Sequence, residues 1–237
     1  MTPIHDSVLA AARQPGTRRG LVGGGALALA ALAAAALPGG RAALAQANRA
    51  GGQGGGTGGD GGGDGYTDLE VLNYALTLEH LEYAFYRDGL ERFSKQAFKR
   101  AGFGGPAYGR LQTIRAHERT HVETLTRVIR GLGGDPVEEA PCYDFAAAFR
   151  SVKAFLATAQ LLENTGVMAY DGAVALIDSP ELRTAGATIA TVEARHAAYL
   201  NDLNGDSPFP EAFDEPKTPE QILAAAAPFF DCEAGGA

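Results

Sequence analysis

Apolar residues recur at alternating intervals of three and four along four separate segments of this 237-residue chain. This spacing places them on one face of an α-helix, and no segment shows the period of two that a half-buried β-strand requires. We therefore predict an all-α fold in which four apolar faces pack together as a four-helix bundle. The predicted helices cover about 67–93, 106–131, 144–177 and 179–204.

The connections between these segments indicate how the helices are joined. The first two helices, and the last two, are close enough in sequence to form antiparallel hairpins. Residues 132–144 reach about 43 Å when extended, whereas the helix before them is expected to be about 39 Å long. This long connection can therefore cross the whole bundle. Thr218 and Pro219 predict the start of one more short helix near the C-terminus.

Each predicted helix carries a carboxylate near the middle of its apolar face, where a leucine would be expected. A buried carboxylate is costly unless it is paired or binds a metal, and four together repel one another. Two Glu-x-x-His motifs, beginning at Glu118 and Glu193, each place a carboxylate and an imidazole on one helix face. Two metal ions would supply the compensating charge, and these ligands suit iron, manganese or zinc. The candidate ligands are Glu79, Glu118, His121, Glu163, Glu193 and His196.

The first and third helices repeat one pattern, a glutamate followed seven residues later by a tyrosine. Glu79 and Tyr86 form the first copy, and Glu163 and Tyr170 form the second, so the chain resembles two related hairpins that face each other across the metals. The alignment places Glu82 opposite a glycine, which favours Glu79 as the ligand. Glu82 remains an alternative ligand or a neighbour of one. The two tyrosines either pack in the core or hydrogen-bond to a ligand carboxylate.

Two other interpretations of these residues stay open. His117–His121 also spells the H-E-x-x-H pattern of zinc metalloproteases, in which both histidines bind zinc. That interpretation lacks a third helical ligand and leaves the second Glu-x-x-His motif unexplained. The other is a metal-free bundle whose core pairs glutamate with histidine and arginine. In the two-metal interpretation, His117 is expected on the surface or beside a ligand, and His80 on the helix surface.

The first 45 residues have the three parts of an export signal: a basic start, an apolar segment and a cleavage site. Arg18 and Arg19 are typical of a twin-arginine signal. The segment after them is rich in alanine and glycine, too weakly hydrophobic for a permanent membrane span, and small residues suit cleavage after Ala45 or Ala47. We therefore predict a twin-arginine signal peptide over 1–45 and an exported protein, periplasmic or secreted, with no membrane attachment after cleavage.

A glycine-rich segment follows, with eleven glycines between Gly51 and Gly65. Because this composition cannot bury apolar surface, we predict a flexible linker over 46–65. The folded bundle domain is then expected over 66–237.

The composition also excludes several classes of protein. A net charge of −8 with no basic patch argues against nucleic-acid binding, which needs lysine and arginine to displace phosphate counterions. Two cysteines are too few for an iron–sulfur cluster or a four-cysteine zinc site. In an oxidising compartment, Cys142 and Cys232 are expected to form a disulfide.

Three stretches of the sequence resemble one known family. Leu78–Tyr86, Val192–Tyr199 and Ser207–Pro210 are similar to exported ferritin-like proteins, a family that includes plant desiccation-related proteins and many bacterial proteins with twin-arginine signals. The resemblance covers about 66–232. It implies a ferritin-like four-helix bundle with a di-iron site, and the candidate ligands match the ligand set of ferritin-like di-metal carboxylate proteins.

The resemblance brings no settled reaction, so two classes of function stay open. In the first, two metal ions, iron first and manganese second, react with dioxygen or hydrogen peroxide in iron oxidation or peroxide removal under stress. In the second, the protein is a non-catalytic stress or desiccation protectant with a structural or vestigial metal site. Metal content and turnover of Fe(II) with an oxidant separate the two classes. An oligomer is compatible with both.

Overall fold

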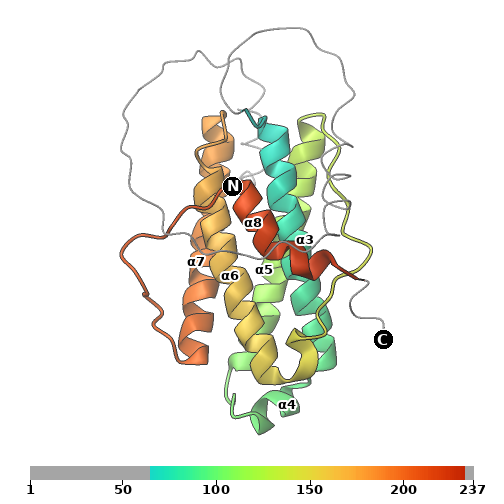
Figure 1. Cartoon of the computed structure of the whole chain (residues 1–237), viewed down its shortest axis with the longest axis vertical. Coiled ribbons are helices and arrows are strands. Elements are labelled where there is room, and N and C mark those ends of the chain that lie inside the picture. Colours follow the sequence, from blue (N-terminus) through green and yellow to red (C-terminus); the bar gives the residue numbers. More distant parts are fainter. Residues whose placement is uncertain (1–64, 233–237) are drawn as a thin grey trace, which may run out of the picture.

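The computed structural model describes residues 65–232, in which four long helices stand side by side (Figure 1). They are α3 (Asp68–Arg92), α5 (Ala107–Gly131), α6 (Val152–Ala173) and α7 (Pro180–Asn204). α3 packs against α5, α6 packs against α7, and α3 also contacts α6. Residues 65–232 contain no β-strand. The predicted all-α four-helix bundle is therefore confirmed.

The predicted signal peptide (1–45) and the predicted linker (46–65) lie outside the described residues, apart from Gly65. Residues 233–237 also lie outside them. Among the described helices, none combines the length and the apolar character that crossing a membrane requires.

Local sequence signals set the ends of the long helices. The Thr67 hydroxyl accepts a hydrogen bond from the Glu70 N–H, and the Glu70 carboxylate accepts one from the Thr67 N–H, which completes a capping box at the start of α3. The Ser179 hydroxyl caps α7 by accepting from the Leu182 N–H. α7 ends at Asn204, and Gly205 follows it with a φ of 92°, in the left-handed region that glycine adopts without strain.

The third long helix begins at Val152, not near Asp144 as predicted. Its start is set by Ser151, whose extended backbone interrupts the helical path and whose hydroxyl accepts from the first turn of α6. Between α5 and this cap, the structure has one helical element, the short 3-10 helix η1 (Ala148–Arg150). The connection between the hairpins is therefore longer than predicted, over 132–151, and it runs along the bundle (Figure 1).

Two further differences concern short segments. α4 (Lys95–Arg100) was not predicted, because its six residues are too few to show an apolar period; Ser94 caps it. α6 ends at Ala173, not at Ile177, because residues 174–176 form a turn.

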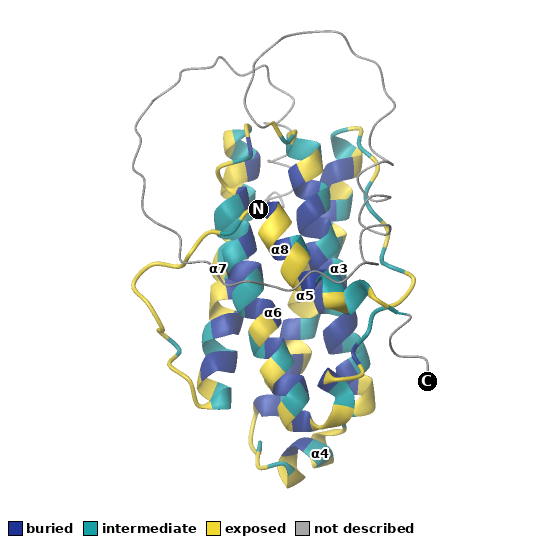
Figure 2. Cartoon of the chain, viewed as in Figure 1, coloured by how far each residue is buried: buried dark blue, intermediate teal, exposed yellow. Residues whose placement is uncertain are grey.

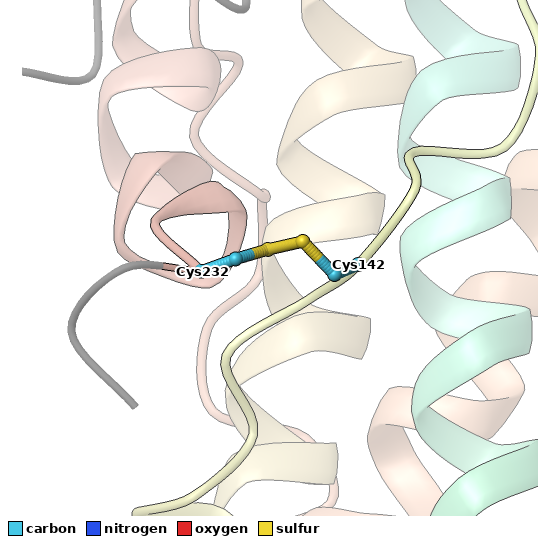
Figure 3. The surroundings of a disulfide bond; sticks show 2 residues. All are labelled: Cys142 and Cys232. Carbon is cyan, nitrogen blue, oxygen red and sulfur yellow. A yellow bond between two sulfur atoms is a disulfide. The ribbon is translucent and has the colours of Figure 1, made fainter. Parts of the chain in front are cut away.

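A short C-terminal helix and a disulfide complete the domain. The predicted short helix is α8 (Pro219–Ala226), which packs against α6 and continues into the 3-10 helix η2 (Ala227–Phe230). Cys142 in the crossover and Cys232 after η2 form a disulfide, the pair expected from the sequence (Figure 3). The disulfide therefore fastens the end of the domain to the crossover between the hairpins.

Buried residues lie on the faces that the long helices turn toward one another (Figure 2). On one side of the central glutamates this core is aromatic. Phe85 stacks on Phe155 with ring centroids 4.9 Å apart and meets Phe145 edge-on at 5.2 Å. A Cβ atom added at Gly89 would lie 2.2 Å from the Phe155 ring, so the rings approach the backbone of α3 directly. We name this side of the core the aromatic end; it consists of Phe85, Phe98, Phe145, Phe149 and Phe155.

Candidate metal centre

The six predicted ligands meet in one buried layer midway along the bundle. α3 and α6 each contribute a glutamate, and α5 and α7 each contribute a glutamate and a histidine. Their ligand atoms form two groups, and within each group all atoms lie within 4.8 Å of one another. The groups are Glu79, Glu118, His121 and Glu193, and Glu118, Glu163, Glu193 and His196. Two glutamates, Glu118 and Glu193, therefore belong to both groups.

The two groups are built alike around an imidazole. His121 Nδ1 lies 2.9 Å from Glu118 Oε2 and 3.2 Å from Glu79 Oε2. His196 Nδ1 lies 3.1 Å from Glu163 Oε2 and 3.1 Å from Glu118 Oε1. The two hairpins that repeat in the sequence thus contribute similar arrangements of imidazole and carboxylate groups to the layer.

Three buried carboxylate oxygens in the layer accept no hydrogen bond from any described residue: Glu118 Oε1 and both oxygens of Glu193. His121 Nδ1 lies 3.0 Å from Glu193 Oε1, but without the geometry of a hydrogen bond. Buried polar atoms without partners are costly, and cations would satisfy these oxygens. Carboxylate oxygen together with imidazole nitrogen suits iron, manganese and zinc. The residues present therefore fit two metal ions that share Glu118 and Glu193.

Burial and crowding shift the pKa values within the layer. Burial raises the pKa of Glu79 to about 7, against the lowering effect of His121. Burial and the charge of Glu193 raise the pKa of Glu163 well above its ordinary value. Burial lowers the pKa of His196, but the surrounding carboxylates of Glu118, Glu163 and Glu193 outweigh burial and raise this pKa to about 12. Without metal, the layer therefore favours bound protons as its compensating charge.

Two tyrosines cross the bundle to hydrogen-bond to the outer glutamates. The Tyr86 hydroxyl on α3 donates to Glu163 Oε1 on α6 at 2.6 Å. The Tyr170 hydroxyl on α6 donates to Glu79 Oε1 on α3 at 2.5 Å. Each tyrosine thus orients the glutamate of the other hairpin, and Tyr86 also packs edge-on against Phe85. The two alternatives for Tyr86, core packing and a hydrogen bond, occur together.

Comparison with known proteins agrees with this geometry. The family model described as the ferritin-like domain matches residues 67–206, which is more than half of the chain. The chain belongs to the ferritin-like family. Protein rds1 of Schizosaccharomyces pombe (strain 972 / ATCC 24843) is 28% identical over 166 residues. That match covers 69% of this chain and 39% of the relative, so the chain spans less than half of the relative's length.

Glu82 lies next to the ferritin-like layer but in neither group of ligand atoms. It faces Gly166, as the alignment of the two hairpins indicates, because a Cβ atom added at Gly166 would lie 3.1 Å from Glu82 Oε1. Burial and the charge of Glu193 raise the pKa of Glu82 well above its ordinary value. The structure thus places Glu82 beside the candidate ligands, where an added side chain on α6 would crowd it.

His117 contacts His196 across the bundle. His117 Nδ1 lies 2.9 Å from His196 Nε2, and the two rings stack with centroids 5.2 Å apart. His196 therefore turns one ring nitrogen to the carboxylates and the other to His117. A zinc protease site would need His117 and His121 in one ligand group, and neither group in the described residues includes His117.

His80 differs from its predicted position on the helix surface. It is half-buried, and its Nε2 atom donates to the backbone carbonyl of Val137 in the crossover at 3.2 Å. The long connection between the hairpins covers this side of α3, which the periodicity of α3 alone cannot reveal.

A cavity of about 610 Å³ reaches the layer from the side opposite the aromatic end. Its lining includes His121 and Tyr170, two residues that contact Glu79. This cavity was not predicted from the sequence. The available signal was Gly186, a glycine on the apolar face of α7, and nothing lies within 4 Å of a Cβ atom added there. We name this region the cavity end; it comprises the lining residues within 71–75, 121–128, 170–177 and 182–192.

Proposed function

We propose that this ferritin-like chain binds two metal ions in the buried layer, iron first and manganese second. The observation that carries the proposal is the pair of ligand groups that share Glu118 and Glu193. Shared carboxylates can bridge two cations and cancel their charge, which accounts for four glutamates at positions that otherwise belong to a hydrophobic core. The predicted ligand set would then act as one unit.

Within this proposal, each side chain has a defined task. His121 and His196 would each hold one ion, with Nδ1 as the nitrogen that faces the carboxylates. Glu79 and Glu163 would complete the two groups, and tyrosine hydroxyls fix the orientation of these glutamates. Bound iron would supply redox chemistry with dioxygen or hydrogen peroxide. We propose iron oxidation or peroxide removal under stress as the resulting activity.

We further propose that the protein acts outside the cytoplasm, as the predicted twin-arginine leader indicates. The disulfide between Cys142 and Cys232 supports this location, because disulfides persist in oxidising compartments and are rare in reducing ones.

Elemental analysis of the full chain, purified from its own export route, tests the proposal. We expect two metal ions per chain, together with oxidation of Fe(II) by dioxygen or hydrogen peroxide. Glu193→Gln should lose both ions, because Glu193 belongs to both ligand groups. Glu82→Gln is the matched control, since it makes the same substitution at a buried glutamate outside both groups, and it should keep both ions.

Two results would contradict the proposal in different ways. One zinc ion per chain, lost in His117→Ala but retained in Glu193→Gln, would favour the protease interpretation. Two bound metal ions with no turnover of either oxidant would support the proposed metal site but refute the proposed redox activity. The second result would favour a protein that uses the metals to stabilise its fold.

A further inference from the structure

The cavity end lies along the least packed edge of the bundle. The backbone of α3 lies close to that of α5, and the backbone of α6 close to that of α7, whereas the backbones of α5 and α7 lie farther apart. The cavity of about 610 Å³ occupies this edge and has lining residues from all four helices. Its volume is in the range of sites that bind small organic ligands.

The walls of the cavity are apolar along most of their length. Leu72, Leu125 and Ile177 are among the buried side chains that line it. Two threonines of α7 also line it, but Thr188 and Thr191 donate their hydroxyls to backbone carbonyls of their own helix. The walls therefore offer few free polar groups, which favours an aliphatic ligand over a sugar or a nucleotide.

The two ends of the cavity differ in chemistry. At the inner end are His121 and Tyr170, which contact the candidate ligand Glu79. Farther out is Arg183, ten residues before Glu193 on α7 and thus about 15 Å from the level of the layer. An elongated molecule in the cavity would therefore extend from the guanidinium to the candidate metal centre.

Arg183 is available for an anion. Its Nε and Nη2 atoms donate to backbone carbonyls at residues 177 and 178, and no described residue accepts a hydrogen bond from Nη1. Asp171 is the carboxylate among the residues that line the cavity, and it lies on α6, whereas Arg183 lies on α7. A carboxylate head group would accept from the exposed guanidinium in a charge-assisted hydrogen bond.

We propose that the cavity binds a long-chain carboxylic acid, with its head group at Arg183 and its aliphatic chain directed toward His121 and Tyr170. The placement of the aliphatic chain beside metal ions rests on the proposed function, whereas the binding of the acid depends only on the apolar walls and Arg183. Bound in this way, the aliphatic chain of the acid would keep bulk water from the inner end of the cavity, and its terminal carbons would lie nearest the layer.

Calorimetric titration of the full chain with lauric acid tests the proposal. We expect saturable binding of one molecule per chain and no saturable binding of butyric acid, which lacks the apolar chain. Gly186→Leu should weaken lauric acid binding by about tenfold or more, because the new side chain enters open space in the cavity. Thr184→Leu is the matched control, since it adds the same side chain at an exposed position of α7 outside the lining, and it should bind normally.

The head group is tested separately. Arg183→Gln should weaken binding of lauric acid but leave binding of lauryl alcohol unchanged, because the alcohol has no charge to pair. Equal loss for both ligands, or tighter binding of laurylamine than of lauric acid by the unaltered chain, would overturn the assignment of the head group.

Failure of this proposal can be distinguished from failure of the proposed function. Glu193→Gln should lose metal but still bind lauric acid, and metal content is measured in the same samples. Absence of saturable lauric acid binding, or unchanged binding in Gly186→Leu, would overturn the proposal whatever the metal content. Sedimentation that shows a dimer dissociated by Gly186→Leu would also overturn it, because the cavity would then be covered by a second copy of the chain.

Discussion

The aromatic end and the cavity end lie on opposite sides of one carboxylate layer and differ in how tightly they are filled. At the aromatic end, the Phe155 ring approaches Gly89 so closely that a Cβ atom at Gly89 would lie 2.2 Å from it. At the cavity end, nothing lies within 4 Å of a Cβ atom added at Gly186. The same helices are thus close-packed on one side of the layer and separated on the other.

This difference indicates that the aromatic end stabilises the fold, whereas the cavity end gives access to the layer. A layer of buried glutamates destabilises a fold when no metal is bound, so the stability of the bundle must come from elsewhere. The aromatic end, in which Phe85, Phe98 and Phe155 are fully buried, supplies close packing of that kind. The cavity end contributes less packing and leaves a route to His121. If this division is correct, equivalent substitutions at the two ends should have unequal effects.

The largest difference is expected for leucine truncations. Leu156→Ala, on the aromatic side of Glu163, should cost about 4–5 kcal/mol, because Leu156 is fully enclosed and the structure cannot close the void. Leu182→Ala should cost about 2–3 kcal/mol, because Leu182 already borders the cavity and has fewer contacts to lose. Urea unfolding of the metal-free protein measures both values, and equal losses would refute the division.

Removal of the disulfide should destabilise the protein by a similar amount and leave binding at the cavity end unchanged. Cys142 precedes Tyr143, whose ring stacks on Phe145, and the bond closes a loop with a sequence separation of 90. Cys142→Ser together with Cys232→Ser should lower the free energy of unfolding by about 4 kcal/mol. The reduced, unaltered chain should lose the same amount. Weakened lauric acid binding in the folded double variant would show instead that the two ends are coupled.

The layer between the ends should give the metal-free protein a distinctive pH dependence. The pKa of Glu79 is raised to about 7 and that of Glu163 is raised well above its ordinary value, so these carboxyls bind more protons in the folded than in the unfolded state. The pKa of His196, raised to about 12, acts in the same direction above about pH 6.5. Stability should therefore fall, on the order of 2 kcal/mol, as the pH rises from about 5 to about 8.

Thermal melts across that pH range measure the effect, and Glu163→Gln should make the metal-free curve flatter. The metal-loaded protein should show the opposite dependence, since protons compete with metal for glutamate and histidine at low pH. A metal-free curve that is flat and unchanged in Glu163→Gln would mean that the carboxylates do not share one buried layer.

Much of this fold was predictable because its signals are local and repeated. The spacing of three and four predicted the bounds of α3, α5 and α7 to within one residue of those in the structure. No other signal in those segments competes with the helical period. The candidate ligands were visible because a glutamate on an apolar face is out of place. The repeat then separated Glu79 from Glu82, and the contact of Glu82 with Gly166 in the structure agrees with that alignment.

The features that were missed depend on contacts between segments. Asp144 and Ser151 are both residue types that favour a helix N-cap, and the choice between them depends on how the crossover packs. The contact between His117 and His196 joins α5 and α7. The apolar spacing within one helix does not predict how that helix is rotated relative to another. The cavity depends on the separation of α5 and α7, and a sequence shows which side chains are small but not where the space between helices remains.

The smallest expected effect offers the sharpest comparison, because one substitution should change sign between the two ends. Gly186→Ala should raise stability by about 0.4–1 kcal/mol, since alanine restricts the unfolded chain and meets nothing in the folded one. Gly89→Ala has the same advantage, but the close approach of Phe155 opposes it and should leave a net loss of about 1 kcal/mol. Phe155→Leu in the Gly89→Ala background should recover part of that loss, and a double-mutant cycle by urea unfolding measures the coupling. No such coupling is expected between Phe155→Leu and Gly186→Ala. If both glycine substitutions stabilise the protein, the aromatic end is looser than its ring contacts indicate, and the contrast with the cavity end is lost.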